Sequence, residues 1–194
     1  MSLPSDALHF RGRDRLIALL DAAAGAGDAE AVTARLREAL CTLMDDPDVQ
    51  LPNAVFTPID AHYARRELYR SPDLGYSVVA MTWGPGQATP LHDHCGLWCV
   101  EGVWSGRLEI TQYELLERDG ERARFRAHGG IAAGTGSAGS LIPPHEYHTI
   151  RNPAAGDIAV SLHVYEAPLE TCTVFEPQPD GSYLRALRTL PRDA

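Results

Sequence analysis

The amino-acid sequence predicts a mainly β protein, a barrel or sandwich of short strands preceded by α-helices. A change of composition near Leu74 is the main evidence for this fold class. Before it, residues 13–46 are rich in Ala, Leu, Arg, Glu and Asp, and their apolar residues recur at helical spacing. After it, short runs of β-branched and aromatic residues are separated by Gly and Pro, as they are in sandwiches and barrels.

The N-terminal part contains two expected helices, both within residues 13–46. Their apolar residues recur every three or four positions, at Leu16, Leu19 and Leu20 and again at Val32, Leu36, Leu40 and Leu43. The segment AGAGD at residues 24–28 separates the two helices, and Asp28 is the expected N-cap of the second. A third, short helix is expected over residues 58–69, because the pair Thr57-Pro58 is typical of a helix start.

The later part contains nine strand-like runs with turn residues between them. They are residues 76–83, 84–94, 97–104, 106–115, 122–128, 139–144, 148–152, 158–165 and 171–176. The Gly- and Ala-rich stretch at 127–140 is the expected flexible loop, and the polar residues from Glu176 onward are expected to cover the barrel loosely. We therefore expect a single domain over residues 1–194, with a helical part over about 1–70, a barrel over about 74–176 and a C-terminal tail.

Composition narrows the range of partners. The net charge of -9 disfavours nucleic acid and anionic membrane surfaces, because both would repel the chain. No run approaches ~18 apolar residues, and the start MSLPSDALHFRGRD lacks the features of a signal peptide, so we expect a cytoplasmic protein. The four cysteines are spaced too irregularly for a zinc site or a disulfide framework, and we expect free thiols.

Histidines supply a candidate metal site. His92 and His94 are two residues apart, which places both imidazoles on one side of a strand. Neutral imidazole is a common ligand for first-row transition metals, and this pair needs a further ligand from elsewhere in the chain. His148 and His145 are the rivals for that place, and strand alternation prevents both from pointing inward. Read alone, a His-X-His pair is also compatible with a surface pair that binds no metal.

The wider pattern resembles the cupin superfamily. The first cupin motif is matched by Gly86, His92, His94 and Gly106 at the expected spacings, with Cys99 in the place of the usual Glu. The second is matched by Pro143, His148 and Asn152, with His145 in the place of a Gly. The resemblance implies a cupin barrel, that is, a double-stranded β-helix or jelly roll, and it selects His148 as the third ligand. Loss of the Glu leaves more open positions on the metal.

One branch of the superfamily is similar in more detail. The chain resembles the thiol dioxygenases of the cysteine dioxygenase type I family, as a bacterial member, over roughly residues 63–165. The matching motifs are Tyr63-Ala64-Arg65, Trp83-Gly84 and the run from Ser161 to Tyr165. This resemblance implies iron(II), held by His92, His94 and His148.

The resemblance also implies roles for other residues. Arg65 would hold a substrate carboxylate, for which its planar guanidinium is suited, and Tyr63 would add a hydroxyl donor. Tyr165 would donate to dioxygen or substrate. His163 would hold the Tyr165 hydroxyl, with Ser161 behind it as an outer support. Cys99 corresponds to the cysteine that mammalian-type members join covalently to the tyrosine matching Tyr165. Many bacterial relatives have Gly at this position, so the resemblance does not decide whether the Cys99–Tyr165 thioether forms.

Several other residues have a simpler interpretation. Arg66 is expected to be a solvated helix charge, and His9, His62 and His128 are expected to be surface residues. Trp83, Trp98 and Trp104 are expected to pack in the barrel, with Trp98 at the pocket wall. Cys95 departs from the family pattern, and the sequence gives it no role.

The function implied by the resemblance is oxidation of a small carboxylated thiol by O₂ at iron(II), in which cysteine becomes cysteine sulfinate. The alternative substrates are 3-mercaptopropionate and mercaptosuccinate. An alternative of another class is a non-catalytic cupin that binds a metal or ligand. A manganese or zinc isomerase or oxidase is a third, although such cupins usually retain the Glu that Cys99 replaces. The expected partners are therefore the thiol and O₂, and the expected state is a monomer or small homo-oligomer.

Overall fold

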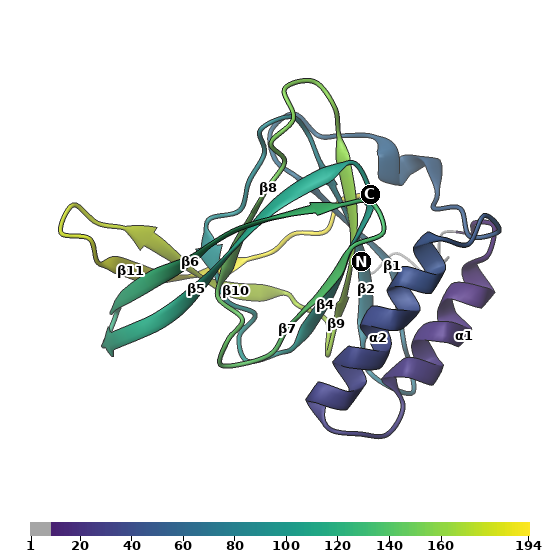
Figure 1. Ribbon diagram of the computed structural model, residues 1–194, viewed down its shortest axis with the longest axis horizontal. Coiled ribbons are helices and arrows are strands. Elements are labelled where there is room, and N and C mark those ends of the chain that lie inside the picture. Colours follow the sequence, from purple (N-terminus) through teal and green to yellow (C-terminus); the bar gives the residue numbers. More distant parts are fainter. Residues whose placement is uncertain (1–8) are drawn as a thin grey trace.

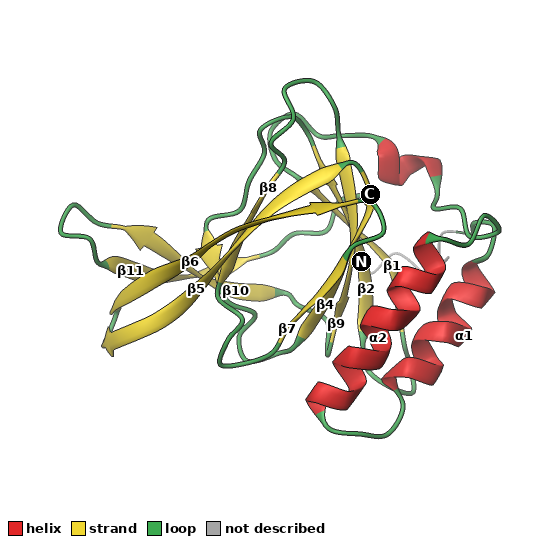
Figure 2. Ribbon diagram, in the orientation of Figure 1, coloured by secondary structure: helices red, strands yellow, loops and turns green. Residues whose placement is uncertain are grey.

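The computed structural model describes residues 9–194; residues 1–8, which belong to the expected helical part, lie outside the described residues. Within that range the chain forms two α-helices, one 3-10 helix and eleven strands (Figures 1 and 2). In chain order they are α1 (Arg13–Ala24), α2 (Ala29–Met44), η1 (Asn53–Phe56), β1 (Ala64–Arg70), β2 (Ser77–Trp83), β3 (Leu91–His92), β4 (Cys99–Ser105), β5 (Arg107–Asp119), β6 (Arg122–Gly134), β7 (Ala138–Leu141), β8 (His148–Arg151), β9 (Ala159–Tyr165), β10 (Thr171–Pro177) and β11 (Tyr183–Thr189).

The strands form two antiparallel sheets. One sheet has the order β1-β2-β9-β4-β7; the other has the order β10-β11-β6-β5-β8-β3 and closes on itself because β3 also pairs with β10. Side chains from both sheets fill one apolar core between them, such as Met81 and Trp83 from β2 and Leu108 and Ile150 from the other sheet. The expected fold class, a mainly β cupin-type barrel with N-terminal helices, is confirmed.

The two helices cover the outer face of the first sheet (Figure 1). Their expected apolar positions, among them Leu16, Leu20, Leu36 and Leu40, are buried against outward-facing residues of β2, β4 and β9. Asp28 is the N-cap of α2, as predicted, since its carboxylate accepts a hydrogen bond from the Ala31 N–H at 2.9 Å. Because one face of the sheet contacts the helices and the other the barrel core, β2 and β9 are buried along their whole length.

The prediction of a third helix over residues 58–69 is wrong. Residues 64–70 form β1, which pairs with β2, and the 3-10 helix η1 lies before them. Pairing with a buried neighbouring strand overrides the helix start signal at Thr57-Pro58. The register places Arg65 opposite the inward-facing Met81 and Arg66 opposite the outward-facing Ala80.

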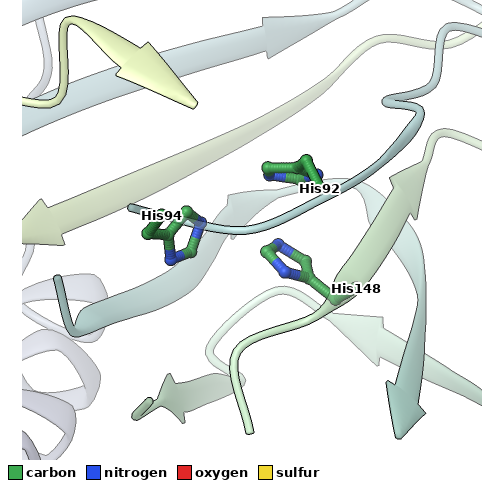
Figure 3. A group of neighbouring side chains, drawn as sticks. All are labelled: His92, His94 and His148. Carbon is green, nitrogen blue, oxygen red and sulfur yellow. The ribbon is translucent and has the colours of Figure 1, made fainter. Parts of the chain in front are cut away.

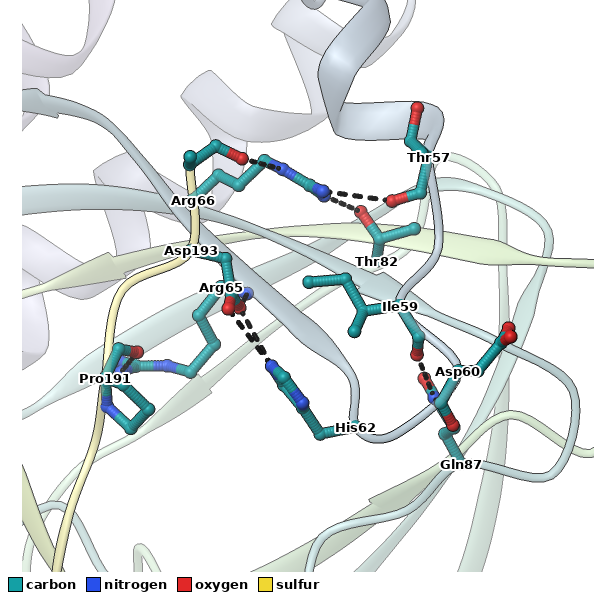
Figure 4. Close-up of polar contacts among 11 residues, drawn as sticks. Thr57, Ile59, Asp60, His62, Arg65, Arg66, Thr82, Gln87, Pro191 and Asp193 are labelled. Carbon is teal, nitrogen blue, oxygen red and sulfur yellow. Dashed lines mark hydrogen bonds and ion pairs between the residues drawn. The ribbon is translucent and has the colours of Figure 1, made fainter.

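Arg66 is therefore not a solvated helix charge. It is 5% exposed, and its guanidinium donates to the Thr82 hydroxyl at 3.2 Å and to the carbonyls of Thr57 and Ala194. These bonds tie β1 to Thr57 in the segment before it (Figure 4) and to the last residue, Ala194.

Two further expectations about irregular segments are wrong. Most of residues 127–140 is strand, in β6 and β7, because small residues still supply the backbone groups that pair with β5 and β4. Nor does the C-terminal part lie loosely on the barrel, since β11 pairs with β10 over seven residues. Of the predicted strand at 84–94, only Leu91–His92 is extended into the sheet as β3.

No helix among residues 9–194 combines the length and apolar character needed to cross a bilayer.

Gly106, at the turn between β4 and β5, has a backbone φ of 82°, and a Cβ there would lie 2.9 Å from the Ile158 carbonyl oxygen. We expect Gly106→Ala to lower the free energy of unfolding by roughly 2–4 kcal/mol, from left-handed strain plus overpacking. Gly120→Ala is the matched control, because its φ is also positive but no atom lies within 4 Å. Urea unfolding would measure the free energy of unfolding of both variants. Equal losses of free energy would show that the close approach to Ile158 does not contribute.

Candidate metal centre and substrate pocket

Three of the predicted site residues meet in the barrel. His92 ends β3, His94 follows two residues later, and His148 begins β8, where it is the register partner of His92. The ring centroids of His92 and His148 are 4.4 Å apart, and those of His94 and His148 are 5.1 Å apart. One nitrogen from each ring lies within 4.8 Å of the others, and the three side chains surround a common space (Figure 3).

Backbone carbonyls orient two of these rings. Nδ1 of His92 lies 3.1 Å from the Pro90 carbonyl oxygen, and Nδ1 of His148 lies 2.7 Å from that of Glu146. A carbonyl only accepts, so each Nδ1 carries the hydrogen and each Nε2 keeps a free lone pair. Burial lowers the pKa of both histidines, so both stay neutral, the state that binds a metal.

The ring nitrogens of His94 indicate whether the site is suited to a cation. It is 0% exposed, and neither of its ring nitrogens has a hydrogen-bond partner among the described residues. Burial lowers its pKa well below the usual value, and the nearby imidazoles lower it further. A buried polar group without a partner is costly. A metal ion held by one nitrogen of each imidazole would give one His94 nitrogen a partner and so reduce that cost, and the donor set fits a first-row transition metal with open coordination positions. His145, the rival for the third place, is exposed.

Cys99 and Tyr165 face each other across β4 and β9, where they are register partners. Both are buried, and burial raises the pKa of the Cys99 thiol and of the Tyr165 phenol well above their usual values. Both groups therefore keep their protons near neutral pH. The Tyr165 ring meets the edge of His94 at a centroid distance of 5.4 Å, which places the phenol beside the metal ligands.

A cavity beside the histidines contains the predicted substrate residues. Its wall includes Tyr63, Arg65, Trp83, Tyr165 and Arg188, together with His92, His148, His163, Leu169 and Cys172. Its charged side chains are the two arginines, and no carboxylate belongs to its wall in the described part of the chain. The cavity is therefore electrostatically matched to an anionic ligand, although the chain as a whole is negative.

Arg65 is held in place by its neighbours. It is 5% exposed, and its Nη1 and Nη2 donate to the carbonyls of Pro191 and Leu169 at 3.3 and 3.4 Å. A guanidinium has five N–H groups, so three donors remain for a ligand. Tyr63 stacks on Trp83 at a centroid distance of 4.6 Å, and burial raises the pKa of its phenol, which stays a donor.

The chain matches a known family over most of its length. A family model described as cysteine dioxygenase type I matches residues 38–178. This protein belongs to the cysteine dioxygenase type I family. The prediction of the family from the sequence is confirmed.

Individual relatives are distant. Cysteine dioxygenase type 1 of Danio rerio is 22% identical over 121 residues, and that of Homo sapiens is 23% identical over 123 residues. These matches cover 62% and 63% of this chain and 60% of each relative, so they span less than two thirds of the relatives' length.

The chain is also similar to parts of solved structures, among them the crystal structure of TT1209 from Thermus thermophilus. Its TM-score is 0.45 at 20% identity, and the match covers 62% of this chain and 96% of that one. A protein with a double-stranded β-helix domain from Klebsiella pneumoniae has a TM-score of 0.47 at 17% identity, covering 64% of this chain and 92% of that one.

His163 differs from its predicted arrangement. We expected its ring to hold the Tyr165 hydroxyl, but the two rings stack at a centroid distance of 6.0 Å and an interplanar angle of 17°. Its Nε2 is instead 2.8 Å from the Ser161 hydroxyl, and that oxygen accepts a hydrogen bond from the Trp83 indole at 2.9 Å. Ser161 thus lies behind His163, as predicted. Burial, and then the charge of Arg65, lower the pKa of His163 to about 3.

The last residues of the chain support Arg65. The Asp193 carboxylate accepts from the Arg65 N–H at 2.9 Å and lies 3.1 Å from Nε2 of His62, and the Asp193 N–H donates to the Arg65 carbonyl at 2.8 Å (Figure 4). The tail therefore continues beside β1 and places the Pro191 carbonyl against the guanidinium. His62 is exposed, as expected, but it has this partner.

Sequence reasoning missed some residues of the site and misplaced one. Trp98 packs in the cluster beneath the helices, and it is Trp83 that lines the cavity. Cys172 and Leu169 also line it, and nothing in their local sequence indicates this. Glu101 could have been found, because it is two residues beyond Cys99 and strand alternation gives both the same inward face.

Glu101 is a buried carboxyl beside the site. It is 7% exposed, its Oε2 lies 3.5 Å from Nδ1 of His163, and burial raises its pKa to about 7. It does not belong to the group that could hold a metal, nor to the wall of the substrate cavity.

His148→Ala should lower the affinity for divalent first-row metals by more than about 100-fold, because losing a ligand costs more than losing the outer partner of one. His145→Ala is the matched control, three residues away and exposed, and it should bind metal as the wild type does. Equilibrium dialysis with metal analysis measures both. Equal loss in the two variants, or none in either, would contradict the assignment of His148.

Glu101 should give folding stability a pH dependence. The native carboxyl keeps its proton up to about pH 7, whereas the unfolded chain releases it near 4.5. The native state therefore binds more protons between these values, and the stabilisation that Glu101 provides falls as pH rises through that window. Relative to Glu101→Gln, wild type should lose up to about 3 kcal/mol between pH 4.5 and 7.5. Urea unfolding at the two pH values measures this, and a constant difference would refute it.

Proposed function

We propose that this protein is an iron(II)-dependent thiol dioxygenase that converts cysteine to cysteine sulfinate. The observation that carries the proposal is the cluster of three buried histidines beside a cavity whose only charged side chains are arginines, among the residues described. Membership of the cysteine dioxygenase type I family supports the same reaction. The balanced reaction is RSH + O₂ → RSO₂H, in which sulfur loses four electrons and O₂ gains them, so no further reductant is needed.

A ferrous ion on His92, His94 and His148 would supply the redox chemistry that lets O₂ react with the thiol sulfur. The three neutral imidazoles carry no charge that would balance a cation, so this site would favour binding of the substrate as a thiolate. The protein then has to bind two reactants in the right geometry and keep water away.

Arg65 binds the substrate carboxylate through the guanidinium donors that Pro191 and Leu169 leave free. Because β1 is fixed to β2 on one side and to the tail on the other, the guanidinium is preorganised before substrate arrives. Tyr63 adds a hydroxyl donor near the same end of the pocket, with its ring held against Trp83.

Tyr165 donates a hydrogen bond to dioxygen or to the substrate beside the histidines. Its raised pKa keeps the phenol protonated, so the group is a donor and not a base near neutral pH. The flat face of His163 supports the ring from one side, and the opposed Cys99 lies beside it on β4. Both neighbours stay uncharged near neutral pH, so neither adds a charge beside the phenol.

The alternative substrates are 3-mercaptopropionate and mercaptosuccinate. Both present a thiol and a carboxylate, as cysteine does, and Arg65 would serve each of them. Arg188 is a second cation in the cavity wall, and it specifically favours mercaptosuccinate as a candidate because that thiol has a second carboxylate. A non-catalytic cupin that only binds a ligand is the alternative of another class.

Oxygen consumption by the iron(II)-loaded protein tests the proposal. We expect uptake with one or more of the three carboxylated thiols and slow uptake with cysteamine, which lacks the carboxylate. Arg65→Ala should raise KM for the carboxylated thiols by about 10- to 100-fold, the loss expected for a charged contact of about 1.5–3 kcal/mol, and should leave cysteamine unaffected.

The matched control is His145→Ala, which alters an exposed residue and should behave as wild type. Absence of uptake with every thiol would favour the non-catalytic alternative. An equal rise in KM for cysteamine in Arg65→Ala would contradict the contact between Arg65 and the substrate carboxylate.

A further inference from the structure

A second cavity lies on the other side of His163 from the substrate pocket. It has a volume of about 210 Å³, and most of its wall is apolar, with residues such as Val103, Leu108 and Leu141. His163 and Ile150 belong to the walls of both cavities, so these side chains separate them. Glu101 lines the second cavity, and within the described range Glu101 and His163 are its titratable groups.

The hydrogen-bond partners of the His163 ring favour one tautomer when Glu101 is ionised. The Trp83 indole can only donate, so the Ser161 oxygen accepts from it, and the hydroxyl hydrogen of Ser161 is free to go to Nε2 of His163. Nε2 is then the acceptor, and the hydrogen of the neutral ring lies on Nδ1. Nδ1 faces the Glu101 Oε2 at 3.5 Å and the Cys99 sulfur at 4.0 Å, and the carboxylate is the stronger acceptor.

Glu101 lacks a competing partner. Its Oε2 is fully buried and has no hydrogen bond to any other described group. A buried carboxylate in that state is costly, and a movement of a few tenths of an ångström toward Nδ1 would give both groups a partner. The result is one continuous line of contacts along the inner face of the first sheet, from Glu101 on β4 through His163 and Ser161 on β9 to Trp83 on β2.

We propose that Glu101 is a positioning residue that fixes the tautomer and the plane of His163 from the side opposite the substrate pocket. Glu101 does not reach the pocket itself, so it acts on substrate only through the His163 ring, which stacks on Tyr165. The geometric part of this inference stands on the contacts alone; its consequence for turnover rests on the proposed function.

The ionisation state of Glu101 selects between two arrangements. An ionised carboxylate accepts the Nδ1 hydrogen; a protonated carboxyl donates to Nδ1 and moves the ring hydrogen to Nε2, which then donates to Ser161. The pKa of about 7 supports an exchange between the two near neutral pH. The titratable groups packed around Glu101 are His163 and Tyr165 on β9 and Cys99 on its own strand, and the pKa directions of these three groups keep all of them uncharged at that pH.

The test is nitrogen-15 NMR of the His163 side chain in chelator-treated protein, compared between wild type, Glu101→Gln and Glu101→Leu. In wild type the hydrogen should lie on Nδ1 at pH 8 and pass to Nε2 as pH falls through about 7. Glu101→Gln keeps an acceptor that does not titrate, so Nδ1 should keep the hydrogen at both pH values. Glu101→Leu should lose the preference for Nδ1. Gln112→Leu, a change in the same cavity wall, should behave as wild type.

Turnover supplies the second readout. Glu101→Leu should lower kcat/KM for thiol oxidation by about 10- to 100-fold, the size of loss seen when the partner that orients a metal-binding histidine is removed. Glu101→Gln should lose less of its kcat/KM, and its kcat/KM should not show the change with pH near 7 that we expect for wild type. Wild-type tautomer and pH response in both Glu101 variants would overturn the inference.

The two proposals fail separately. If wild type oxidises no thiol, the proposed function fails, and the NMR comparison still decides the role of Glu101. If Glu101→Leu does not fold, the pH response of Glu101→Gln decides it alone.

Discussion

The barrel interior depends on the burial of three neutral imidazoles around one space. Two of them donate Nδ1–H to backbone carbonyls, and the third, His94, has no hydrogen-bond partner in the described part of the chain. Burial of unused lone pairs costs free energy, and a bound cation would offset part of that cost. The burial that makes the arrangement costly also keeps the rings uncharged, which is the state a cation requires.

The sheet that faces this space can be chemically specialised because its other face is covered. On β9 the inward residues Ser161, His163 and Tyr165 alternate with Val160, Leu162 and Val164, which belong to the core cluster under the helices. The apolar outer face supplies the stabilisation, so the inner face can present polar groups. The helices contribute no residue to the site, yet without them this sheet would expose its apolar side to water.

The end of the pocket that contains Arg65 is built from the first strand and from the last residues of the described chain. Arg65 lies on the first strand, and residues 191–193 bring a carbonyl and a carboxylate against it (Figure 4). Such a contact between distant segments orders a long, flexible side chain before any ligand arrives. It also explains why Arg65 and Arg66, neighbours in sequence, differ in role: strand alternation sends one guanidinium into the cavity and the other toward η1 and the C-terminal residue.

The sequence alone determined the fold class, the two helices with the N-cap at Asp28, the family, and the three histidines, because these depend on local spacing and on motifs that survive low identity. It could not place residues 58–70 or the tail, since their conformation is decided by pairing with strands distant in sequence. The tertiary structure alone decided that His163 stacks on Tyr165 rather than bonding its hydroxyl, and that Glu101 faces it. Which donor meets which acceptor depends on distances of a few tenths of an ångström between strands, and no spacing along a chain encodes these.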